Sequence, residues 1–93
     1  MDDGIKKIYN QAADKWGIDH QLLKLGEECA ELAVECIKTT TDKEKRMLNL
    51  IEEMADVSIM LEQVSYLLGI GQDIITERET KLERLRRRVN EKN

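Results

Sequence analysis

Two pairs of carboxylates, Glu28 with Glu31 and Glu53 with Asp56, are the residues of this chain whose spacing best suits chemistry. The members of each pair are three residues apart, so on an α-helix both side chains project from one face. If the two helices lie side by side, the four carboxylates converge on one place. Oxygen ligands gathered in this way suit a hard divalent cation, and we predict Mg²⁺, with Mn²⁺ as the alternative.

The surroundings of the second pair differ from those of an ordinary charged surface. Between Met54 and Leu61, the only polar residues are Asp56 and Ser58. An ionised carboxylate in such an apolar setting is costly unless a cation compensates it. The second pair therefore favours a binding site over a solvated helix face.

The first pair shares a polar arc with Lys24 and Glu35, and on its own this arc fits a solvated face equally well. The two helices together decide between these interpretations. Two carboxylates about 5 Å apart repel by roughly 3 kcal/mol at an effective dielectric constant near 20. Without a cation, such a cluster is expected to bind protons or to splay apart.

Composition indicates one small all-α domain, residues 1–93. The chain has 93 residues with 41% hydrophobic content, no Pro and five Gly. A chain of this length has a small core, so we expect it to self-associate. The net charge of −4 does not favour a nucleic acid polymer as partner. We also expect neither a membrane span nor a secretion signal, because no apolar run is long enough.

Two cysteines, Cys29 and Cys36, are too far apart along one helix to form a disulfide with each other. We expect reduced thiols in the core of a cytoplasmic protein. Trp16 completes the apolar stripe of the first helix, and we expect it to pack in the core rather than against a ligand. His20 is expected to be exposed near the start of the second helix.

Apolar periodicity predicts a four-helix bundle with helices at about residues 3–16, 20–38, 42–68 and 72–91. Residues 39–42 form a short link, and Thr41 with Glu44 has the form of a capping box. The second and third helices should therefore pack antiparallel, with the acidic pairs near their middles. We expect the third helix to turn its apolar residues toward its neighbours: Met47, Leu50, Ile51, Met54, Val57, Leu61, Val64 and Leu68.

The fourth helix has a narrow apolar seam that suits an edge or a partner subunit, formed by Ile75, Leu82, Leu85 and Val89. The end of this helix is basic. Cations there stabilise the helix C-terminus through its dipole. The alternative is that one or two of them reach the phosphates of a ligand.

The chain resembles the MazG-like, all-α nucleoside triphosphate pyrophosphohydrolase superfamily. That superfamily carries an E-x-x-E pair on one helix and an E-x-x-D pair on the next, and the matching residues here are Glu28, Glu31, Glu53 and Asp56. The resemblance covers residues 18–68. It has weaker support at residues 81–84, where Lys81 and Arg84 resemble the Lys and Arg of the last helix in the superfamily.

The resemblance implies an Mg²⁺-dependent enzyme that cleaves a (deoxy)nucleoside triphosphate between the α and β phosphates, giving a monophosphate and pyrophosphate. It implies that the four carboxylates hold the metal and perform catalysis, with Lys24, Lys81 and Arg84 as phosphate contacts. It also implies a homodimer or a homotetramer. Two alternatives stay open: a pyrophosphohydrolase acting on phosphoribosyl-ATP or dUTP, and a non-catalytic helical interaction module.

Overall fold

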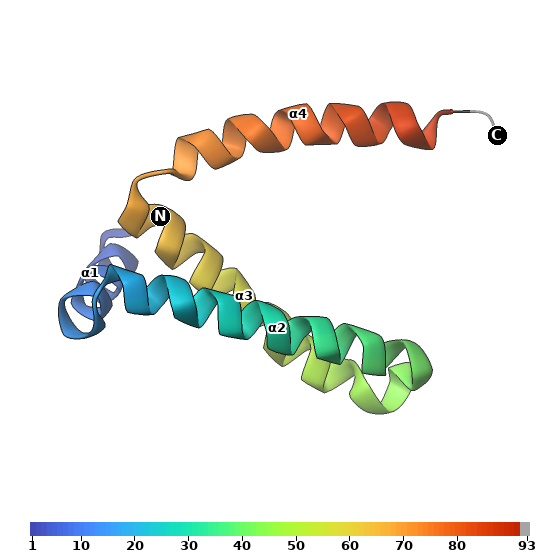
Figure 1. Cartoon of the computed structure of the whole chain (residues 1–93), viewed down its shortest axis with the longest axis horizontal. Helices are drawn as coiled ribbons and strands as arrows, with labels where there is room; N and C mark the ends of the chain where they lie inside the picture. The colour runs from blue at the N-terminus through green and yellow to red at the C-terminus, as the bar shows by residue number, and fades with distance from the viewer. Residues whose placement is uncertain (92–93) are drawn as a thin grey trace.

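The computed structural model describes residues 1–91 and contains four α-helices, with no strand in that range. The helices are α1 (Asp3–Trp16), α2 (Ile18–Thr41), α3 (Lys43–Leu68) and α4 (Gly71–Val89). Helices α2 and α3 pack antiparallel as the closest pair, α1 crosses one end of that pair, and α4 leads away from the end of α3 (Figure 1). The predicted all-α four-helix bundle with antiparallel second and third helices is therefore confirmed.

The link between α2 and α3 is shorter than predicted. The side chains of Thr39, Thr40 and Thr41 donate hydrogen bonds to carbonyls three or four residues earlier, at 2.7 to 2.8 Å. These bonds give the three hydroxyls partners within the helix, and α2 continues to Thr41. The prediction of a capping box at Thr41 was wrong. Asp42 is the N-cap of α3, and its side chain accepts a hydrogen bond from the Lys45 backbone N–H at 3.3 Å.

Hydrogen bonds between polar side chains fix α1 on the C-terminal half of α3. The Tyr9 hydroxyl donates to Glu62 Oε1 at 2.8 Å, and Asn10 Nδ2 donates to the Tyr66 hydroxyl at 3.0 Å. Burial of the Tyr9 hydroxyl, together with its bond to Glu62, raises the pKa of Tyr9 to about 12. At its other end, α1 stops at Gly17, whose φ of 87° and ψ of 154° are open to glycine but strained for other residues. The single-residue turn therefore sets the angle between α1 and α2.

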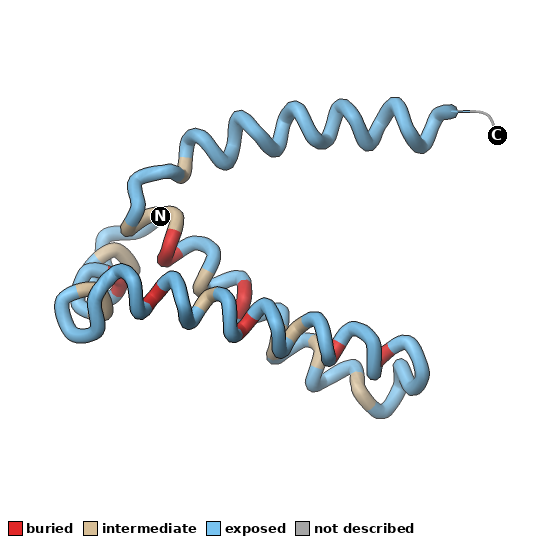
Figure 2. The backbone as a smooth tube through the Cα atoms, viewed as in Figure 1, coloured by how far each residue is buried: buried red, intermediate tan, exposed pale blue. Residues whose placement is uncertain are grey.

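The seam between α2 and α3 is largely polar, and this reverses part of the sequence prediction. The buried polar residues are Gln21, Glu28, Glu35, Thr39 and Gln63, whereas the buried apolar residues of the described chain are Tyr9, Val57 and Val64. Figure 2 shows how few positions are buried. Because polar side chains occupy much of the seam, many apolar side chains of the two helices are left exposed.

Several residues expected in the core are exposed as a result. Of the apolar residues assigned to the inner face of α3, Val57 and Val64 are buried and Leu50 is half-buried, while the exposed ones are Met47, Ile51, Met54, Leu61 and Leu68. Cys29 and Cys36 are free and exposed on α2, and Trp16 is 53% exposed. The core predictions were therefore wrong for these exposed residues in a single subunit. They are confirmed for Val57 and Val64, and His20 is exposed as predicted.

The exposed apolar residues are interspersed with charges along every helix. Among the helices of residues 1–91, none combines the length and the apolarity needed to cross a bilayer.

Candidate metal centre

Three of the four predicted carboxylates come together across the seam between α2 and α3. Glu28 of α2 and Glu53 and Asp56 of α3 each offer one oxygen, and these oxygens lie within 4.8 Å of one another. We call these three residues the acid cluster. Each helix supplies its acids from a single inner face, as the spacing of three residues requires. The arrangement has the oxygen chemistry that a hard divalent cation prefers.

Two oxygens of the acid cluster are buried without a hydrogen-bond partner in the described chain, Glu28 Oε2 and Glu53 Oε2. Glu28 as a whole is only 9% exposed, whereas Asp56 is exposed. A buried acceptor without a partner is costly, and an ionised one more so. A cation bound between the two helices would satisfy both oxygens at once, so the residues present fit a divalent metal ion.

The electrostatics of Glu53 are consistent with such a site. Burial is the main cause that raises the pKa of the Glu53 carboxyl above its ordinary value of 4.5, and the charges of Glu31, Glu28 and Asp56 raise it further. The folded state therefore holds a proton at Glu53 more tightly than the unfolded state does.

This raised pKa predicts how stability depends on pH when no metal is present. The stability that Glu53 contributes is complete below its ordinary pKa and is lost as the pH rises through the raised value. As the pH rises from about 4 to about 8 in EDTA, the melting temperature should therefore fall less for the Glu53→Gln variant than for the wild type. Thermal melts followed by circular dichroism test this, and parallel pH profiles for the two proteins would contradict it.

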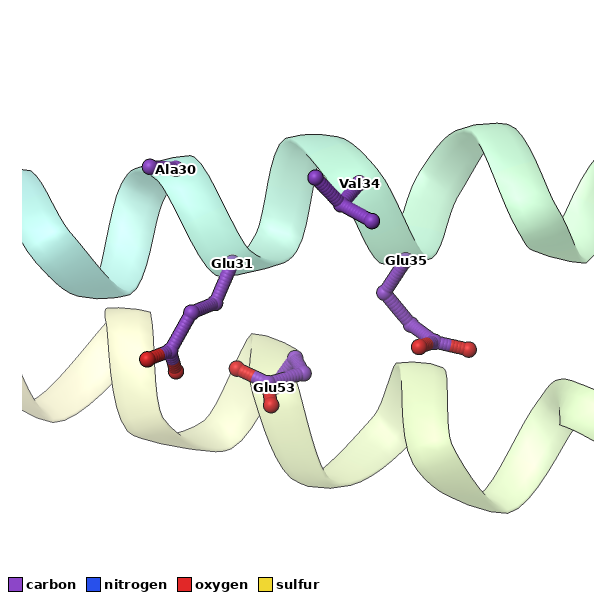
Figure 3. Close-up of a pocket in the computed structure, with 5 residues that line it drawn as sticks. All are labelled: Ala30, Glu31, Val34, Glu35 and Glu53. Carbon is purple, nitrogen blue, oxygen red and sulfur yellow. The ribbon is translucent and has the colours of Figure 1, made fainter.

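Glu31, the fourth predicted acid, lies at the edge of the acid cluster. It is exposed on α2, and it lines a hollow of about 390 Å³ together with Glu35, Glu53 and two small apolar residues. In Figure 3, Glu31 and Glu35 point from α2 toward α3 on either side of Glu53. Glu31 is therefore placed to act on a group held at the acid cluster, rather than at its centre.

Two polar contacts hold the helices together on either side of the acid cluster. On one side, Gln63 Nε2 of α3 donates a hydrogen bond to Gln21 Oε1 of α2. On the other, Arg46 of α3 binds both oxygens of Glu35, with Nε 2.9 Å from Oε1 and Nη2 3.0 Å from Oε2. These contacts oppose the repulsion among the carboxylates, and sequence reasoning missed them. The signal was the seven-residue spacing of Gln21, Glu28 and Glu35, which places all three on one stripe of α2.

The pair of Arg46 with Glu35 gives a second stability prediction. Arg46 lowers the pKa of the largely buried Glu35 carboxyl, so its contribution is present above the ordinary pKa of 4.5 and lost as the pH falls through the lowered value. Arg46→Met keeps the apolar stem and should lower the urea midpoint at neutral pH, with a smaller effect in acid. Arg86→Met, which breaks an exposed pair with Glu83, should change little. Equal effects of the two substitutions would contradict the prediction.

The fold places one of the three predicted phosphate contacts at the acid cluster and the other two away from it. Lys24 lies at the acid cluster, with its Nζ 3.4 Å from Glu28 Oε1, and this pairing is the main cause that raises the pKa of Lys24. Lys81 and Arg84 lie on α4, which within residues 1–91 packs only against α3 and leads away from the acids (Figure 1). A single subunit in this conformation does not bring them to the acid cluster.

Comparisons with known proteins give no family assignment. No match was found among family models, curated proteins or solved structures.

Proposed function

We propose that the chain is an Mg²⁺-dependent nucleotide pyrophosphohydrolase that cleaves a (deoxy)nucleoside triphosphate between the α and β phosphates. The observation that carries this proposal is the pair of buried, unpartnered oxygens on Glu28 and Glu53, which lie on different helices beside Asp56. The spacing of the four acids resembles the paired motifs of the MazG-like superfamily, and this resemblance supports the choice of reaction. The products would be a nucleoside monophosphate and pyrophosphate.

In this proposal the acid cluster holds the metal, with Glu28, Glu53 and Asp56 as ligands. A bound Mg²⁺ supplies charge neutralisation for the phosphates and a lowered pKa for water. Glu31, beside the cluster, accepts the proton of the attacking water. Glu27 suits this role less well, because its carboxylate pairs with Lys24 at 3.6 Å.

Lys24 binds a phosphate oxygen in the proposed reaction. Its ammonium group lies on the α2 side of the acid cluster, and its pKa is raised by Glu28 and Glu27, so it stays charged at neutral pH. A phosphate that neutralises Lys24 would leave Glu28 free to bind the metal. The chain thus offers carboxylates for the cation and an amine for the anion at one place.

Pyrophosphate release from a panel of nucleotides tests the proposed function. The panel should contain the common ribo- and deoxyribonucleoside triphosphates, dUTP and phosphoribosyl-ATP, each with Mg²⁺ and with EDTA. Release that depends on Mg²⁺ from at least one substrate supports the enzyme and identifies its substrate class. No release from any of them, with an intact fold, would contradict it.

We further propose that the chain works as a homodimer or homotetramer. Large apolar side chains on all four helices are open to solvent, among them Ile8 at 61%, Ile37 at 70%, Leu48 at 74% and Val89 at 70%. Covering such side chains with a partner removes apolar area from water and is favourable. A second copy would cover them, and a neighbouring α4 would supply the Lys81 and Arg84 that a single subunit holds apart from the acids.

Sedimentation velocity at micromolar concentration should therefore give a dimer or a tetramer. Ile51→Glu places a charge on the outer face of α3, where the native side chain is 55% exposed, and should shift the equilibrium toward the monomer without unfolding the helices. A wild-type monomer at these concentrations would contradict self-association.

The same exposed surface favours the second candidate function, a non-catalytic helical interaction module. Both candidates predict self-association, so that property does not separate them. They differ in turnover: an assembled, folded protein that hydrolyses nothing in the panel would be the module.

A further inference from the structure

A groove of about 360 Å³ lies among α1, α2 and α3, and its volume is within the usual range for small-molecule sites. Trp16 comes from α1, Gln21 and Lys24 come from α2, and Met60 and Gln63 come from α3. Its other lining residues are Ile8 and Ala12 of α1 and His20 of α2, so the groove combines an indole, an imidazole, apolar side chains, two amides and an ammonium group. This set of groups suits a planar polar ring that carries a negative charge at one end.

The indole of Trp16 forms a wall of the groove and is 53% exposed, which is unusual for the only tryptophan of a chain. Lys15 Nζ lies 5.0 Å from the ring centroid, but Lys15 lines a separate hollow that shares Trp16 with the groove. The ring is therefore accessible from the groove. An accessible aromatic ring can stack on any base, because every base has a π-face.

The amides of Gln21 and Gln63 line the same groove and are 5% and 7% exposed. The amino group of Gln63 donates to the carbonyl oxygen of Gln21. No other hydrogen bond in the described chain engages the amino group of Gln21 or the carbonyl oxygen of Gln63. The pair thus retains one donor and one acceptor side by side, whichever way the two amides are oriented. An edge with an adjacent acceptor and donor, as a nucleobase has, complements it.

Lys24 connects the groove with the acid cluster. Lys24 lines the groove and also pairs with Glu28 of the cluster at 3.4 Å. On α2, Gln21 precedes Glu28 by seven residues, a rise of about 10 Å along the helix. On α3, Met60 follows Asp56 by one helical turn. A ribose with its 5′-phosphate bridges a separation of this size.

We propose that the groove binds the base of a nucleotide whose phosphates lie at the acid cluster. The ring stacks on Trp16, its hydrogen-bonding edge meets the amides of Gln21 and Gln63, and Lys24 meets the first phosphate. This assignment rests on the proposed function for the phosphate end alone, since base binding at the groove requires no metal. The ligand class is a purine or pyrimidine nucleotide rather than a sugar phosphate or an inorganic polyphosphate.

The fluorescence of Trp16 measures this binding directly, because it is the only tryptophan in the chain. The protein, in EDTA, is titrated with AMP, GMP, CMP and UMP, and with ribose 5-phosphate as the ligand that lacks a base. At least one nucleotide should quench the emission saturably, and ribose 5-phosphate should not. The double variant Gln21→Leu with Gln63→Leu removes both partners of the buried bond together, which spares the fold, and should weaken binding about tenfold. Gln72→Leu, at an exposed position on α4, is the matched control and should bind as the wild type does.

The outcomes for the groove are separable from those for the enzyme. Base-dependent quenching without any hydrolysis would support the groove and overturn the proposed function. Mg²⁺-dependent hydrolysis with no quenching by any nucleotide, and with turnover unchanged in the double leucine variant, would overturn the groove alone. Binding that is equal for ribose 5-phosphate and the nucleotides would also overturn it. A blue-shifted Trp16 emission that responds to no ligand would overturn the groove as a nucleotide site too, because it would indicate that a second copy of the chain covers Trp16.

Discussion

Replacing Glu53 by Gln should reduce Mg²⁺-dependent pyrophosphate release by at least about 100-fold, because loss of an outer-shell partner alone costs metal sites 10- to 100-fold. Glu53 is the member of the acid cluster with both a buried, unpartnered oxygen and a raised pKa. The amide keeps the shape of the side chain but cannot supply a negative charge. Initial rates on the preferred nucleotide, at saturating Mg²⁺, measure the loss.

The neighbouring Glu52 provides the matched control for this substitution. It is exposed, and it stands one position away on the same helix, so that its side chain lies about 100° around from Glu53. Glu52→Gln makes the same chemical change and should leave the rate within about twofold of the wild type. If both variants lose activity equally, the loss comes from the change in net charge, and the assignment of Glu53 as a metal ligand is wrong.

Mg²⁺ should stabilise the folded chain markedly. A ligand that binds only the folded state at a hundredfold excess over its Kd stabilises it by about 2.7 kcal/mol. For a domain of this size, that corresponds to a rise in Tm of about 10–20 °C. The physical source is relief of the repulsion among Glu28, Glu53 and Asp56, together with satisfaction of the buried oxygens of Glu28 and Glu53. Thermal melts over a range of MgCl₂ concentrations measure the effect.

The stabilisation should be specific to the acid cluster. KCl at matched ionic strength should produce little of it, because screening acts weakly on buried charges. Glu53→Gln should abolish most of the Mg²⁺-dependent rise, although this variant begins from a higher metal-free stability at neutral pH. An equal rise in wild type and variant would place the bound ion elsewhere on this acidic protein.

The helices and their antiparallel arrangement could be predicted because each rests on local signals. Apolar periodicity, the glycine at residue 17, the link at residues 39–42 and the break at residues 69–71 are sufficient for the four elements. The spacing of three residues likewise predicted that each acidic pair shares a face. Those features depend on the chain within one helix.

Which face of each helix turns inward could not be predicted so well. Helix α2 carries both an apolar stripe and a polar stripe, and the sequence assigned the apolar one to the core. In the structure, Gln21 and Glu35 face α3, because the amide pair and the Arg46 contact satisfy them there, and Glu28 lies between them on the same stripe. Such pairings join residues 11 and 42 positions apart, so they depend on how two helices meet.

The placement of single site residues was predicted unevenly for the same reason. Asp56 stands in the more apolar sequence, yet it is exposed, while the buried oxygen belongs to Glu53. Trp16 belongs to an apolar stripe, but α1 crosses only the end of the α2–α3 pair and leaves the indole half open. The position of α4, which separates Lys81 from the acids, depends on the turn at Gly69 and had no sequence signal.

The central claim is that Glu28, Glu53 and Asp56 share one divalent ion. Crystals grown with MnCl₂, with data collected at the manganese absorption edge, test it most directly. The account predicts an anomalous peak between α2 and α3, within about 2.0–2.6 Å of oxygens from both helices. Manganese ordered elsewhere on the protein, with these carboxylates turned apart into solvent, would contradict it.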